Sequence, residues 1–324
     1  GWDIKRMLGT VPVEEDGSVI FKAPANTPIS IQPLDKDGVA IQWMRSWVTG
    51  QPGEVVSCIG CHEDQNQIAI PKRVIASQKA PSALTLPEGG TRSFTFDLEV
   101  QPILDRACIA CHNGEGKAFD LRGGKKDKLG YGTSYLNLHP YVHRQGGEGD
   151  MVVLQPYEYH PNTSELVRLL KKGHHNVKLT DKEWKTLYNW IDYNAPDKGY
   201  FNANVLTDLP YKGFDQIKRR KELTDKYANG AGVDWKKEIA DYADYLKKQG
   251  PITPVMPEKA APVKEKTLKV KGWPFGADRI KEMLAKEKET RKVVEIAPGV
   301  KVNFVRIPAG EFVMGSYRGE PDAY

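Results

Sequence analysis

The sequence has no long hydrophobic run, and its excess of positive charge is small. No stretch reaches the ~18 consecutive apolar residues of a membrane-spanning helix. Residues 1–10 lack a basic segment followed by an apolar one, so no signal peptide is visible there. The 47 Lys and Arg against 42 Asp and Glu leave a net charge of only +5 over 324 residues. These features predict no transmembrane segment and no nucleic-acid partner.

Cysteine is scarce as well, but all four cysteines occur in two copies of one pattern. The copies are Cys58-x-x-Cys61-His62 and Cys108-x-x-Cys111-His112. Two such matches are expected by chance at roughly the 10⁻⁶ level, and the pattern is that of c-type haem attachment. On a helical turn, positions i, i+3 and i+4 share one face, so two sulfurs can join the haem while the imidazole reaches the iron. The sequence therefore predicts two covalent c-type haems, with His62 and His112 as proximal iron ligands.

Three other uses of the cysteines compete with haem. One zinc ion could be held by both Cys-x-x-Cys pairs, although a zinc ribbon does not need a histidine after each pair. A redox dithiol usually occurs once, beside a βαβ pattern that this sequence lacks. Two disulfides are the remaining alternative. Because haem is attached covalently outside the bacterial cytoplasm, the haem interpretation also predicts a periplasmic or extracellular protein.

The first 57 residues have the pattern of short strands. β-Branched and aromatic runs alternate there with turn signals rich in Gly, Pro and Asp. The runs cover residues 10–13, 18–22, 29–34 and 39–47. This spacing predicts a small β-sandwich-like module.

The later residues are predominantly of helical pattern. A helix capped by Asp97 is expected to run into Cys108, with Pro102 in its first turn. Asn162 and Thr180 are the expected N-terminal caps of the next two helices. Helices are predicted over residues 164–172, 180–193, 212–249 (a pair) and 277–291, followed by strands between 293 and 314.

Together these patterns predict an α+β multidomain chain. Residues 1–75 would form the β-rich module that ends in the first haem motif, and residues 76–250 a mainly helical, cytochrome c-like domain with the second. Residues 251–268, rich in Pro and Lys, have the composition of an extended linker. Residues 269–324 would form a partial α+β segment.

Several of these stretches resemble the dihaem region of hydrazine synthase alpha-subunit-like proteins, found in planctomycetes and related bacteria. They are residues 8–18, 44–47, 58–62, 100–104, 108–112, 172–175 and 190–192. The resemblance implies a middle domain with one c-type haem and a cytochrome c-like domain with a bis-histidine haem. In that family a tyrosine one turn past the first motif binds the iron, and Asn66 stands there in this sequence. The resemblance therefore supports the scaffold better than the reaction.

A second resemblance concerns the C-terminal part. Residues 305–316 are similar to the opening strands of the formylglycine-generating, sulfatase-modifying family. The active-site cysteines of that family lie far downstream of this point. The resemblance therefore implies the beginning of such a domain and carries over no catalysis.

The second axial ligand of each iron decides between electron transfer and substrate chemistry. His174 and His175 follow a predicted helix end, where the hydrazine synthase resemblance places a haem-binding histidine. We expect His174 to be the distal ligand of the second haem, with His175 as the alternative. His139 and His160, each beside a proline, are equally good candidates for the first haem. Met44 and Met151 are weaker ones, since Met44 sits in an apolar run.

Three functions follow from the sequence. The leading hypothesis is a dihaem cytochrome module that passes single electrons to other redox proteins, haem subunits or copies of itself. The second is a haem enzyme that acts on small nitrogen compounds at the first haem, as in hydrazine synthase. The third is a structural module held by zinc.

Overall fold

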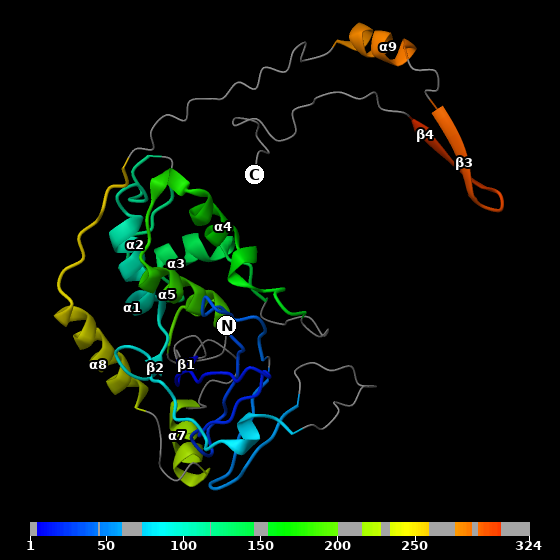
Figure 1. Cartoon of the computed structure of the whole chain (residues 1–324). Coiled ribbons are helices and arrows are strands. Elements are labelled where there is room, and N and C mark those ends of the chain that lie inside the picture. The colour runs from blue at the N-terminus through cyan, green and yellow to red at the C-terminus, as the bar shows by residue number, and fades with distance from the viewer. Residues whose placement is uncertain are drawn as a thin grey trace. The chain divides into compact units, whose positions relative to one another are not determined.

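The computed structural model mixes helices with sheets. The chain divides into two compact units, Gly1–Ala260 and Ala261–Tyr324. The described residues are 5–44, 46–59, 73–116, 118–145, 155–199, 216–227, 234–258, 276–286 and 291–305. Within them, two small antiparallel sheets accompany the helices (Figure 1). The mixed α and β content expected from the sequence is confirmed, while the predicted domain boundaries stay predictions.

The first unit is mainly helical after its N-terminal segment. Its helices are α1 (Phe96–Glu99), α2 (Gln101–Ala107), α3 (Thr133–Leu138), α4 (Glu165–Lys172), α5 (Asp181–Asp192), α7 (Gln216–Tyr227) and α8 (Trp235–Lys248). Short 3₁₀ turns cover Ala76–Gln78, His139–Tyr141, Pro161–Thr163 and His174–Asn176. The expected helices before and within residues 212–249 are therefore present.

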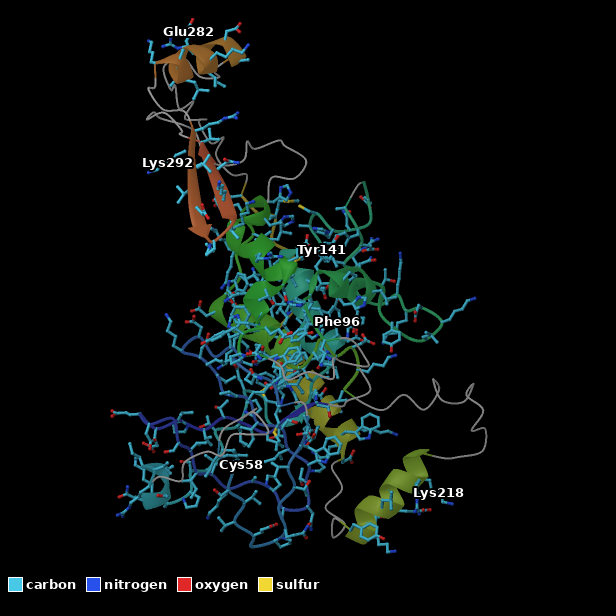
Figure 2. The ribbon with its side chains drawn as sticks, turned by 90° about the vertical axis from the view of Figure 1, so that its right-hand side faces the viewer. Cys58, Phe96, Tyr141, Lys218, Glu282 and Lys292 are labelled. Atoms are coloured by element: carbon cyan, nitrogen blue, oxygen red, sulfur yellow. The ribbon has the colours of Figure 1, made fainter. Side chains whose placement is uncertain are left out.

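The core of this unit lies where α1, α2, α3 and α5 meet. Phe96 and Trp190 are fully buried, with ring centres 5.3 Å apart, and Phe96 packs edge-on against Tyr135. The Trp190 indole N–H donates to the carbonyl of Pro196 at 3.0 Å, so its one polar atom is satisfied. Phe96 sits among the side chains of these helices in Figure 2. This packing holds α2, the helix that leads into the second Cys-x-x-Cys-His motif.

Local capping explains α5 but not α1 or α4. Thr180 and Glu183 form the predicted capping box at the start of α5. The predicted caps Asp97 and Asn162 are wrong, because each side chain has another partner. Asp97 lies in the first turn of α1 and pairs with Lys126 at 3.0 Å. Asn162 instead accepts a hydrogen bond from Lys171 at 2.7 Å.

The N-terminal segment is extended and turn-rich, and the β-sandwich prediction is wrong for its described residues. Its one strand there, β1 (Arg6–Met7), pairs with β2 (Arg92–Ser93). The other pairings are isolated bridges, such as Thr10 with Thr85 and Phe21 with Ser82. Closely spaced turns interrupt each run before a ladder can form, and Figure 1 accordingly draws this blue segment mostly without arrows.

Helix α5 also holds the N-terminal segment. The buried Asp192 carboxylate accepts the backbone N–H of Ala40 at 3.0 Å, and Gln32 donates to the Asp192 carbonyl at 2.8 Å. Trp43 stacks on Tyr159, with ring centres 5.2 Å apart. These contacts attach residues 32–43 to the helical part of the unit.

In the second unit the described residues form one helix and one hairpin. Helix α9 (Ala277–Ala285) ends before Arg291, where the sequence predicted it to end. Strands β3 (Arg291–Ala297) and β4 (Val300–Val305) pair antiparallel, with an irregularity between Glu295 and Ala297. Residues 306–316, which complete the resemblance to the sulfatase-modifying family, lie outside the described residues.

Replacing Asp192 is expected to change how stability depends on pH. Burial raises the pKa of Asp192 to about 7, the Ala40 N–H opposes this rise, and the charge of Asp35 adds to it. An unfolded aspartate titrates near pH ~3.9, so between about pH 4 and 7 the folded state holds a proton that the unfolded chain has released. The stability contributed by this group therefore falls as pH rises through that window.

Asp192→Asn keeps an acceptor for Ala40 but has no proton to lose. Its free energy of unfolding, measured in urea at pH 4, 5.5 and 7, should decline less than that of the wild type, by on the order of 2 kcal/mol. The exposed Asp37→Asn is the matched control. Parallel curves for Asp192→Asn and the wild type would contradict the assignment.

Candidate haem site

The second Cys-x-x-Cys-His motif forms one tight turn at the end of α2. Cys108 caps the helix, with its N–H bonded to the Leu104 carbonyl. The Cys108 carbonyl then accepts the N–H groups of Cys111 at 3.1 Å and His112 at 2.9 Å. A single turn thus carries both sulfurs and the imidazole, which is the arrangement that haem attachment requires.

The two sulfurs of this turn lie in different surroundings. Cys111 is exposed and Cys108 is half-buried, and both are free thiols. Burial raises the pKa of Cys108 to about 12, although the Arg106 charge opposes the rise. A zinc ligand must lose its proton, whereas a thioether sulfur carries neither proton nor charge. The surroundings of Cys108 therefore suit a thioether better than a thiolate.

The His112 ring is oriented by a backbone carbonyl. Its Nδ1 lies 3.1 Å from the Phe119 oxygen, and the two rings pack with centres 4.8 Å apart. A carbonyl can only accept, so Nδ1 is the nitrogen that carries the proton. The Nε2 lone pair is then available to a metal, which is the usual arrangement of a ligating histidine.

His174 faces His112 from the turn between α4 and α5. Gly173 ends α4 in the left-handed region (φ 97°), and His175 (φ 43°) and Asn176 (φ 62°) continue with positive φ. This strained turn places the ring centres of His112 and His174 6.0 Å apart, at 38°. Burial lowers the pKa of His174, and the charges of His175 and His112 lower it further, which favours the neutral form that binds metals.

The spacing of the two rings suits one haem iron between them. Two imidazoles bound end-on to the same metal, with metal–nitrogen bonds of about 2 Å, place their ring centres roughly 6 Å apart. His112 and His174 meet this spacing. His175 is exposed and packs edge-on against His174, with ring centres 4.6 Å apart. The structure thus brings His174, and not His175, to His112.

The candidates for the first haem lie elsewhere. His139 is half-buried, stacks on Tyr135 and has its Nδ1 3.2 Å from the Leu136 carbonyl. His160 is buried, and its Nδ1 accepts the N–H of Asn162 at 3.2 Å. The proton of His160 therefore resides on Nε2, which lies 3.5 Å from Asp35 and has no free lone pair.

Of the first motif, Cys58 lies within the described residues. Cys58 is exposed, in an extended stretch of the N-terminal segment (Figure 2). Cys61, His62, Asn66 and Met151 lie outside the described residues. Met44, which directly follows Trp43 in the sequence, is half-buried. The choice between His139 and His160 stays a prediction. The proton on Nε2 of His160 makes that residue the less favourable of the two.

Sequence reasoning missed two residues of this site. The Phe119 carbonyl orients His112, but a backbone acceptor has no residue-type signature. Arg106 donates to the Lys178 carbonyl at 2.9 Å and forms an ion pair with Glu183. The sequence signal that could have found Arg106 is its position as a basic residue in the last turn of α2, just before the motif. Among the described residues, no group of three or more His, Cys, Asp and Glu side chains is placed to hold a metal ion by itself.

Comparisons with known proteins match the N-terminal part of the chain. The family model described as hydrazine synthase alpha subunit middle domain matches residues 1–63. These residues include the first haem motif, so the resemblance to hydrazine synthase is confirmed for this stretch. No curated protein and no solved structure matches the chain. No helix in the described ranges is long and apolar enough to cross a membrane.

Proposed function

We propose that this chain is part of a c-type cytochrome that carries single electrons. The observation that supports it best is the pair of facing rings, His112 and His174, beside the two sulfurs of one turn. With two histidines on one iron, no coordination position is left for a substrate. Such a centre is suited to electron transfer at low potential.

Each residue of the site has a separate task in this proposal. Cys108 and Cys111 would anchor the haem, and the bound haem supplies one-electron chemistry at its iron. The Phe119 carbonyl keeps the proton of His112 on Nδ1. Phe119 also packs against the His112 ring and stacks on Tyr141, with ring centres 5.5 Å apart, so two aromatic rings lie beside the proposed ligand. The first haem would be held by Cys58, Cys61 and His62.

Partners and location follow from the same chemistry. A single-electron carrier needs a donor and an acceptor, which would be other redox proteins, haem subunits or copies of this chain. Covalent haem attachment implies an exported protein in the periplasm or outside the cell. The match to a hydrazine synthase domain supports a place in a larger redox assembly.

A second candidate function is a haem enzyme whose centre is the first haem. The match over residues 1–63 supports it, because that stretch carries the first motif. Its substrate would be a small nitrogen compound, and its iron would need an open coordination position. The first haem would then perform the reaction while the second supplies or removes electrons.

The number of haems can be counted by mass. Intact-protein mass spectrometry under denaturing conditions should show two covalent haems on the wild type. The double variant Cys108→Ser with Cys111→Ser should retain one, and the same changes at Cys58 and Cys61 should also leave one. An unmodified wild-type polypeptide would contradict the proposal.

The assignment of His174 predicts different behaviour for adjacent histidines. His174→Ala should convert one low-spin haem to a high-spin form that binds carbon monoxide when reduced. His175→Ala should leave the spectrum unchanged, since the ring that lies 6.0 Å from His112 is that of His174. His174→Met should keep the iron low-spin and raise its reduction potential. If His175→Ala opened the iron instead, the assignment would be wrong.

The state of the first haem separates the two candidate functions. For an electron carrier we expect only low-spin ferric signals in electron paramagnetic resonance, with no change on adding nitric oxide or hydroxylamine. A high-spin signal that shifts with either compound would favour the enzyme. The variant lacking Cys58 and Cys61 is the control, because a shift that belongs to the first haem must disappear with it.

A further inference from the structure

We propose that residues 251–258 form a strap that fixes the His174 turn to helix α2, and so controls how firmly His174 is held opposite His112. The strap is the extended segment that follows α8. The inference rests on the proposed bis-histidine haem and adds positioning residues to it, namely Val255 and Asn176.

The strap contacts both elements that carry the facing histidines. The Val255 N–H donates to the Arg106 carbonyl at 2.7 Å, two residues before Cys108. Asn176, two residues after His174, donates its side-chain amide to the Glu258 carbonyl at 3.3 Å. Figure 1 shows this yellow segment running from α8 along α2. Four residues of strap thus bridge the proximal and distal sides of the site.

Arg106 closes this connection into a ring of contacts. Its guanidinium donates to the Lys178 carbonyl at 2.9 Å and to Glu183 at 2.5 Å. Glu183 belongs to the capping box of α5, so the segment between His174 and α5 is held at its far end as well. The turn is therefore fixed by Arg106 on one side and by the strap on the other.

The His174 turn needs such external support. Two consecutive residues with side chains, His175 and Asn176, have positive φ, a conformation that costs energy and persists only when surrounding contacts maintain it. Asn176 is the residue that the strap contacts. Loss of this contact lets the turn relax and draws His174 away from His112.

Few apolar contacts hold the strap itself. The side chains of Ile252, Val255 and Met256 are 47%, 48% and 66% exposed. A cleft of about 530 Å³ is lined by Ile252 and Pro254 of the strap, by Gln101 of α2 and by Ile109 just after that helix. None of Cys108, Cys111, His112 and His174 lines this cleft. The hydrogen bonds of Val255 and Asn176 therefore determine where the strap lies.

The upstream end of the strap is anchored by α8. Buried Tyr242 donates to Glu99 at 3.0 Å and lies under the guanidinium of Arg92, which is 3.4 Å from its ring centre. Arg92 and Glu99 form a buried ion pair at 2.6 Å. Arg6 donates to Glu238 at 2.9 Å on the same helix. The strap thus begins from a fixed point and reaches the haem site over a short distance.

The test measures cyanide binding to the ferric second haem in the full chain. Val255→Pro removes the N–H that bonds to Arg106, and Asn176→Asp removes the amide donor while keeping a residue that tolerates positive φ. Each should speed cyanide binding about tenfold, the effect expected from losing one hydrogen bond. Val255→Ala, which keeps the N–H, is the matched control and should behave as the wild type.

Hydrogen–deuterium exchange of residues 173–179 gives a second readout. Exchange should rise in Val255→Pro and Asn176→Asp and stay unchanged in Val255→Ala. His174→Ala is the reference for a fully open second haem. If His174→Ala binds no cyanide, the bis-histidine proposal itself fails.

If His174→Ala binds cyanide but Val255→Pro and Asn176→Asp bind it no faster than the wild type, only the strap is overturned. The same holds if Val255→Ala binds as fast as Val255→Pro, since the apolar side chain would then be responsible. Asn176→Asp tests the other end of the strap. If Val255→Pro does not fold, cyanide binding and hydrogen–deuterium exchange of Asn176→Asp test the proposal instead.

Discussion

The candidate haem site at the second motif depends on the contacts of Arg106. Its side chain reaches Lys178 and Glu183, and its carbonyl accepts the N–H of Val255. Burial works against ionisation of Glu183, but hydrogen bonds from Arg106 and Thr180 lower its pKa, so the pair is charged at neutral pH. One residue therefore joins three segments that are far apart in the sequence. This junction joins the segments that follow His174 and precede Cys108, and it therefore supports the proposed facing of His112 and His174.

Features that depend on neighbouring residues were predictable from the sequence. The capping box of Thr180 and Glu183 and the turn of Cys108, Cys111 and His112 each involve residues within four positions. The β-sandwich was wrong for a corresponding reason. Thr10 and Phe21 pair with residues 85 and 82, more than sixty positions away, and strand propensity does not identify such partners. The caps expected at Asp97 and Asn162 failed because Lys126 and Lys171 bind those side chains instead.

The same distinction applies to the site. The motif pattern predicted Cys108, Cys111 and His112 as haem-binding residues, but spacing could not choose between His174 and His175, which are adjacent. The choice follows from the left-handed turn after Gly173, and that turn depends on tertiary contacts. Proline-rich composition predicted that residues 251–258 are extended, yet it could not show that they lie against α2. The contribution of Phe119 is a carbonyl oxygen, which every residue has.

Helix α5 connects the two parts of the unit that bear on function. Its N-terminal end, through Glu183, holds the segment beside His174, and its C-terminal end, through Asp192, holds Ala40 of the N-terminal segment. That segment belongs to the stretch matched by the hydrazine synthase domain. A helix of 12 residues is about 18 Å long and bends little. It therefore keeps residues 32–40 of the N-terminal segment at a steady distance from the candidate haem site at the second motif. For the two proposed haems a constant distance would favour electron transfer between them, and α5 would provide it whether the first is a carrier or an open catalytic centre.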